Sequence, residues 1–207
     1  MDPLHHALGE IAAIRGQMAR AGEFRGYGPA ALTATAGVAA AGGLLQPVLV
    51  PDPLRTPAGY VLLWGAAAVL SGTLIGIEAR ARTRRLHGGL SNAMIRAALE
   101  QFLPAGIAGA LITLVILNWQ AGNVALLPGL WQVIFSLGVF ASCRFLPRAA
   151  LWVGTWYLLT GLLALVIASS SLALDPWVMA APFIVGQALA AVVLWRASNS
   201  GRQPEAA

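Results

Sequence analysis

Apolar residues are concentrated in six long runs along the chain, and short polar segments separate them. The runs are Pro29 to Val50, Gly59 to Ile77, Phe102 to Leu117, Val124 to Phe145, Ala149 to Ser169 and Trp177 to Trp195. A helix needs about 20 predominantly apolar residues to cross the hydrocarbon core of a bilayer. Each run is close to that length, so the pattern predicts an all-α, polytopic membrane protein. We expect a bundle of six transmembrane helices arranged as three helical hairpins.

The composition supports the membrane class. The chain is 58% hydrophobic and only 10% charged, whereas soluble domains average about 25% charged residues. Three regions are expected: residues 1–28 form a cytoplasmic helix and hinge, 29–196 form the six-helix bundle, and 197–207 form a cytoplasmic tail. A polar, charged stretch precedes the first run, so we expect no removable signal peptide.

The positions of the arginines predict the orientation of the spans. All thirteen basic residues are arginine, and Arg55 is the only one in a loop of the opposite side. Because short loops rich in arginine stay in the cytoplasm, both termini and the loop from Arg80 to Arg96 are expected inside. Aromatic residues at predicted span ends, such as Tyr60, fit this orientation because their rings prefer the headgroup level. Attraction to anionic lipid accounts for the arginines, so no nucleic-acid partner is expected.

Small residues at four-residue spacing predict where the helices touch. Small side chains let helix backbones approach closely in lipid, where no hydrophobic force drives one helix against another. We therefore expect three faces to pack inside the bundle, and a dimer face is the alternative. They are Thr33, Gly37 and Ala41 in the first span, Ala68, Gly72 and Gly76 in the second, and Pro182, Gly186 and Ala190 in the sixth.

Ionisable residues are almost absent from the runs and stand at their ends. Glu100 lies at the cytoplasmic entry of the third span, four residues after Arg96, so an interfacial ion pair is the simplest interpretation. A proton-linked or cation-binding carboxylate is the alternative, because a charge within a span is costly and marks a functional site. Glu78 and Arg82 have the same spacing, and the same ion-pair interpretation applies to them.

Deeper in the spans, the polar residues are amides and hydroxyls. Gln46, Gln132 and Gln187 are the largest of them. Such groups tie helices together more often than they line a pathway. Both roles remain open for the three glutamines.

The parts of a cofactor, metal or catalytic site are not found in the sequence. Its histidines, at positions 5, 6 and 87, fall outside the runs, so a haem between the spans would have no histidine ligand. His6 and Glu10 share a helix face, but two ligands do not complete a zinc site. The lone Cys143 excludes an intrachain disulfide. We therefore expect no cofactor, no metal and no enzymatic activity.

The residues before the first run predict an amphipathic helix. Leu4, Leu8, Ile11, Ile14 and Met18 recur at helical spacing and form one apolar face. Several glycines weaken this segment as an isolated helix, so we expect it to form against a surface. That surface is the bilayer interface, the protein's own cytoplasmic loops, or the groove of a protein partner.

The segment from Glu10 to Ala21, followed by Phe24 and Tyr27, resembles the N-terminal signature of a group of uncharacterised bacterial multi-span membrane proteins. The later stretch from Val124 to Trp131 is similar to that group as well. The resemblance implies a location in the bacterial inner membrane. It implies no activity, cofactor or functional residue.

Three functional hypotheses follow from the sequence. The first is a non-enzymatic inner-membrane protein that acts through assembly or regulation with a partner, possibly a second copy of itself, through its N-terminal helix. The alternative is a small transporter or channel that moves a neutral or weakly polar solute past Gln46, Gln132 and Gln187. An enzyme acting on lipid or quinone ranks third, because acid–base groups are missing from the spans.

Overall fold

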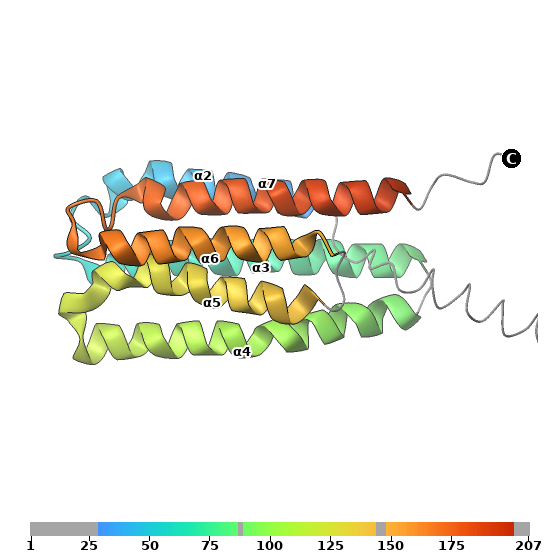
Figure 1. Ribbon diagram of the computed structural model, residues 1–207, viewed down its shortest axis with the longest axis horizontal. Helices are drawn as coiled ribbons and strands as arrows, with labels where there is room; N and C mark the ends of the chain where they lie inside the picture. The colour runs from blue at the N-terminus through green and yellow to red at the C-terminus, as the bar shows by residue number, and fades with distance from the viewer. Residues whose placement is uncertain (1–28, 87–88, 144–147, 201–207) are drawn as a thin grey trace, which may run out of the picture.

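The computed structural model describes residues 29–86, 89–143 and 148–200, and these residues form helices and no strands. In chain order the elements are α2 (Pro29–Leu49), α3 (Pro57–Leu86), α4 (Gly89–Trp119), the 3₁₀ helix η1 (Ala121–Leu126), α5 (Leu127–Ser142), α6 (Ala150–Val166), the 3₁₀ helix η3 (Ile167–Ser169) and α7 (Pro176–Ser200). The six α-helices lie side by side in an elongated bundle (Figure 1).

Among the described residues, the predicted all-α class is confirmed, and so is the presence of six helices of membrane-spanning length and hydropathy. Six helices are long and apolar enough to cross a membrane, over Ala30–Leu49, Pro57–Ala81, Glu100–Trp119, Ala121–Ser142, Ala150–Ser169 and Pro176–Arg196. The segment expected as a loop between the second and third spans differs from the prediction. There α3 continues to Leu86 and α4 begins at Gly89, so most of this arginine-rich segment is helical.

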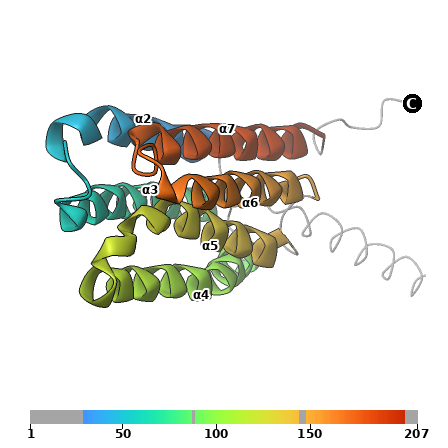
Figure 2. The same cartoon turned by 60° about the vertical axis from the view of Figure 1, so that its left-hand side comes forward.

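The helices contact one another in the cyclic order α2, α7, α6, α5, α4, α3 and back to α2. The first and last spans are therefore neighbours, as Figure 2 also shows. The connections at 50–56, 120–126 and 170–175 all lie at one end of the bundle, which we call the Arg55 end. The start of α2 and the C-terminal part of α7 lie at the opposite end, which we call the Arg80 end (Figure 1).

Apolar side chains cover the outside of the bundle. Val48 and Val166 are each 76% exposed, and Leu62 is 72% exposed. An apolar surface of this extent is abnormal for a soluble monomer. Lipid tails solvate such side chains as well as a protein interior does, so this surface fits a protein embedded in a bilayer.

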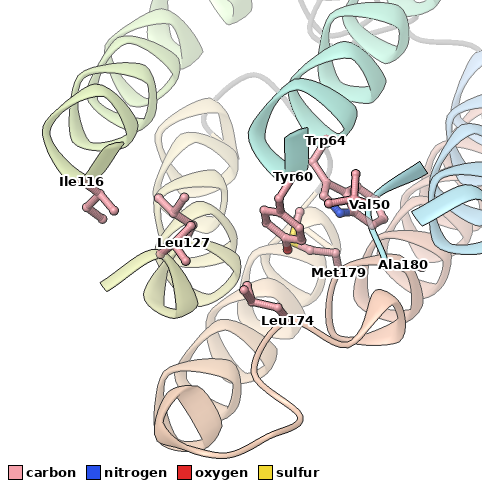
Figure 3. Close-up of a cluster of buried hydrophobic side chains, with 9 residues drawn as sticks. Val50, Tyr60, Trp64, Ile116, Leu127, Leu174, Met179 and Ala180 are labelled. Carbon is pink, nitrogen blue, oxygen red and sulfur yellow. The ribbon is translucent and has the colours of Figure 1, made fainter. Parts of the chain in front are cut away.

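A cluster of buried apolar residues closes the Arg55 end (Figure 3). It consists of Val50, Tyr60, Trp64, Ile116, Val124, Leu127, Leu174, Met179 and Ala180. The ring of Tyr60 is fully buried and stacks on the ring of Trp131, with centroids 6.1 Å apart. The ring of Tyr60 therefore turns into the bundle and not outward, while its depth in the membrane stays a prediction.

Close approach of helices occurs partly where it was predicted and partly elsewhere. Gly186, one of the predicted packing residues, is buried, and a Cβ added there would overlap the ring of Tyr157. The α5 and α6 backbones meet at Gly129 and Gly161, where a Cβ on Gly129 would lie 2.8 Å from the Gly161 carbonyl oxygen. These two glycines lie outside the predicted packing faces.

The predicted packing faces of α2 and α3 are wrong for contacts within the chain. Gly37, Gly72 and Gly76 are exposed, and a Cβ added to any of them would meet nothing within 4 Å. Ala68 on the same face of α3 is also exposed. In lipid a small side chain fits an outward face as well as an inward one, so spacing alone does not distinguish the two.

Candidate functional site

The buried polar side chains of the described residues are all neutral. They comprise Tyr60 and Tyr157 together with Thr35, Gln46, Thr113, Gln132, Ser136, Ser142 and Gln187. The hydroxyls of Thr35, Ser136 and Ser142 each donate to a carbonyl of their own helix, over 2.7 to 2.9 Å. Such bonds satisfy the hydroxyl locally. Thr113 also donates within its own helix, but its hydroxyl accepts from Trp131 Nε1 over 2.8 Å and so joins α4 to α5. The amides and the two tyrosines are the buried polar side chains that remain to be accounted for.

Gln46 ties three segments together at the Arg55 end. Its Nε2 donates to the carbonyl oxygen of Leu174 over 2.8 Å, and its Oε1 accepts from Trp64 Nε1 over 2.8 Å. The side chain is 1% exposed. Because both ends of the amide are engaged with protein groups, Gln46 serves as a structural tie between α2, α3 and the segment before α7. The hypothesis that it lines a pathway does not fit this geometry.

Gln132 compensates for a break in the backbone hydrogen bonding of α7. Pro182 lies inside α7, and since proline has no N–H, the carbonyl four residues earlier loses its helical donor. That carbonyl belongs to Val178, and Gln132 Nε2 donates to it over 3.0 Å. Trp156 Nε1 donates to the carbonyl oxygen of Pro182 itself over 2.9 Å. Side chains from α5 and α6 thus cover the proline segment of α7.

Three fully buried polar atoms have no hydrogen-bond partner among the described residues: the hydroxyls of Tyr60 and Tyr157 and the Oε1 atom of Gln132. The Tyr157 hydroxyl lies beside the side chain of Gln187, but the two groups are not in hydrogen-bonding geometry. A buried polar group without a partner costs about 1–3 kcal/mol. The buried polar groups without partners therefore come from Gln132, which the sequence singles out, and from two tyrosines that were not predicted as interior polar residues.

Aromatic rings surround the deeper part of this site. The ring of Tyr157 lies 4.7 Å from that of Phe135 and 5.1 Å from that of Phe183, measured between centroids. Phe102 packs edge-on against Phe135 at 5.1 Å. The surroundings of the Tyr157 hydroxyl are therefore apolar, apart from Gln187.

Glu78 has a partner that the sequence analysis did not foresee. Its Oε2 accepts a hydrogen bond from the backbone N–H of Ala31 over 2.6 Å. This N–H belongs to the first turn of α2, where backbone donors have no partner within the helix and a carboxylate is favoured by the helix dipole. Glu78 therefore joins α3 to the start of α2. Its predicted pairing with Arg82 involves a side chain outside the described part of the structure.

Glu100 does not join the interior site. It is exposed at the Arg80 end, where the apolar stretch of α4 begins. The side chain of Arg96 lies outside the described part, so the predicted ion pair stays a prediction. Its exposed position separates Glu100 from the buried Gln46, Gln132 and Gln187, so a carboxylate coupled to those glutamines does not fit this geometry.

Metal ligands and the single thiol are the remaining groups to place among the described residues. They contain no group of three His, Cys, Asp or Glu side chains placed to hold a metal ion. Cys143 follows α5 directly, and burial raises the pKa of its thiol. A raised pKa lowers the fraction of reactive thiolate, so Cys143 is poorly suited to nucleophilic catalysis.

The predicted partner-binding face lies outside the described residues. Its members are Leu4, Leu8, Ile11, Ile14 and Met18, and their role stays a prediction. Comparisons with models of protein families, with curated proteins and with solved structures found no match to this chain.

Proposed function

We propose that this chain is a non-enzymatic, multi-pass protein of the bacterial inner membrane with both termini in the cytoplasm. It assembles with a protein partner, or with a second copy of itself, through the apolar face of its N-terminal helix. The six spans are a scaffold that holds this helix at the cytoplasmic face.

One observation carries the proposal: the buried polar side chains of the described spans are neutral, and several polar side chains join one helix to another segment. Gln46, Gln132 and Trp156 each bridge from one helix to another segment. The carboxylates of the described spans, Glu78 and Glu100, lie at the Arg80 end. General acid–base chemistry needs titratable groups within reach of a substrate, and an interior of this kind is better suited to a structural role.

The bond between Glu78 and Ala31 supports a scaffold that positions the N-terminal segment. Since α2 begins at Pro29, a carboxylate that holds its first turn also fixes where residues 1–28 join the bundle. A fixed attachment point lowers the conformational entropy that partner binding must overcome.

The test is a pair of charge substitutions in the full-length chain. Replacing Ile11 and Ile14 together by Asp is expected to abolish co-purification of the partner from native membranes, because an unpaired charge in an apolar groove costs several kcal/mol. The spans should stay folded, with an unchanged melting temperature in detergent. Ala13→Asp combined with Gln17→Asp adds the same charge to another face of the helix and is expected to leave co-purification intact.

Two tagged copies of the chain, expressed together, show whether the partner is a second copy. Self-association predicts that one tag captures the other and that the Ile11 and Ile14 double variant does not. Retention of every stoichiometric partner by that variant contradicts the proposal.

A further inference from the structure

The three unpartnered polar atoms extend from one end of the bundle into its middle. Tyr60 lies three residues into α3 from the Arg55 end, Gln132 lies five residues into α5, and Tyr157 lies nine residues before the end of α6. With a rise of 1.5 Å per residue, their Cα atoms are about 5, 8 and 14 Å from the Arg55 ends of their helices. Half of a hydrocarbon core is about 15 Å thick, so Tyr157 lies near mid-depth.

The orientation of the Gln132 amide is fixed by the protein. Its Nε2 donates to the Val178 carbonyl, and a flipped amide would place Oε1 against that carbonyl oxygen, where two acceptors repel. Gln132 therefore presents a pure acceptor to its surroundings. The hydroxyls of Tyr60 and Tyr157 can each donate and accept. Gln132 Oε1 thus needs a hydrogen-bond donor, and each tyrosine hydroxyl can bond to a donor or to an acceptor. The three atoms lie at increasing depth in the bundle.

The chemistry of a matching ligand follows from these groups and their surroundings. The described interior carries no charge, and an ion without a compensating charge is strongly disfavoured there. Aromatic rings pack around Tyr157, and Gly186 is the residue that leaves space for its ring. A ligand must therefore be small and neutral, and it must donate a hydrogen bond to satisfy Gln132 Oε1.

We infer that the bundle interior binds small neutral molecules that both donate and accept hydrogen bonds, at the Tyr60 hydroxyl, Gln132 Oε1 and the Tyr157 hydroxyl. Water and small polyols or amides share this chemistry. This site lies inside the bundle, whereas the proposed partner surface lies in residues 1–28. An experiment that refutes ligand binding therefore leaves the proposed partner function standing, and the reverse also holds.

Radiolytic labelling of the full chain in detergent tests the inference directly. Hydroxyl radicals formed from bound water oxidise the adjacent side chains, which mass spectrometry then detects. We expect Tyr60 and Tyr157 to be oxidised severalfold faster than Leu127, after correction for intrinsic reactivity, although all three side chains have zero exposure. Oxidation of both tyrosines at the Leu127 rate overturns the inference. The measurement repeated with urea, which reacts only slowly with hydroxyl radicals, identifies the source. Urea that binds at the site lowers the labelling of the two tyrosines relative to Leu127, and a site for water alone keeps that ratio.

Removing each hydroxyl gives an independent readout. If Tyr60 and Tyr157 hold a ligand, Tyr60→Phe and Tyr157→Phe each lower the melting temperature, by about 2–4 °C for a lost hydrogen bond. If a hydroxyl is buried without any partner, its removal leaves the melting temperature unchanged or raises it, which overturns the inference at that position. Thr73→Val is the control, because its exposed hydroxyl donates only to Val69 of its own helix and its loss should be neutral.

Discussion

Gln132 on α5 donates a hydrogen bond to the carbonyl oxygen of Val178 on α7, over 3.0 Å and across 46 residues of sequence. The acceptor is the one carbonyl that Pro182 deprives of a helical donor. In a bilayer no water is at hand to replace such a donor, and each unsatisfied backbone group is costly. Gln132 and Pro182 therefore form a matched pair, in which the amide compensates for the proline.

Gln132→Leu should lower the free energy of unfolding by about 1–3 kcal/mol, because the Val178 carbonyl loses its donor. Melting temperatures in detergent measure the effect. Pro182→Ala restores a backbone N–H to α7, so in that background Gln132→Leu should cost clearly less. Equal losses in the two backgrounds would show that the amide does not compensate for the proline.

Gln46→Leu should destabilise the Arg55 end, because it leaves both the Trp64 indole N–H and the Leu174 carbonyl without their partner. We expect a loss of about 2 kcal/mol or more in thermal unfolding. Trp64→Phe removes one partner only. The double variant should lose less than the sum of the single losses, since the two side chains share a bond. Additive losses would contradict the network.

Gly161→Ala should destabilise the bundle, because the new Cβ would lie 2.9 Å from the backbone nitrogen of Val133. Overpacking of this kind costs about 1–3 kcal/mol. Gly72→Leu is the matched control on a face with open space and should leave the melting temperature nearly unchanged. A large loss in the Gly72 variant, together with a change in oligomer size, would point to a contact between copies at that face.

Glu78→Ala should loosen the start of α2, because the Ala31 N–H loses a charged acceptor. Hydrogen exchange is the most direct measurement, with faster exchange expected at Ala31 and little change at the far end of the helix. Glu78→Gln keeps an acceptor oxygen and should cause a smaller effect. Unaltered exchange in the Ala variant would mean that the carboxylate does not hold this turn.

Topology reporters fused after Arg25, after Gly88 and after Arg202 should all report the cytoplasm. Those inserted at Arg55 and at Asn123 should report the outside. The reason is the concentration of arginine beside one end of the spans. A reporter at Gly88 that faces outward would refute the orientation.

The spans could be predicted because length and hydropathy are dictated by the thickness of the bilayer. The residues at which the helices end were less predictable, because a helix can continue through polar residues. The segment from Arg80 to Leu86 has the composition of a cytoplasmic loop, yet it continues α3. Arginine is a good helix former, so charge alone does not end a helix that has begun in the membrane.

The interior site was predictable only in part. Gln132 and Gln187 stand out because amides are rare in a span. Tyr60 did not, since a tyrosine near a span end is usually an interfacial residue, and only the stacking on Trp131 turns it inward. Gly72 and Gly76 show the opposite error, because their spacing fits packing while their face points away from the bundle.

The contact between the first and last spans has a consequence for how the protein is made. Gln46 emerges from the ribosome 128 residues before Leu174, whose carbonyl it binds. At about 5–20 residues per second, the two are separated by about 6–26 s of synthesis. During that time α2 must remain in the membrane with a polar side chain whose final acceptor does not yet exist. A chain truncated before Leu174 would therefore lack the residues that pack against α2 at the Arg55 end. We expect membrane proteases to degrade such a chain.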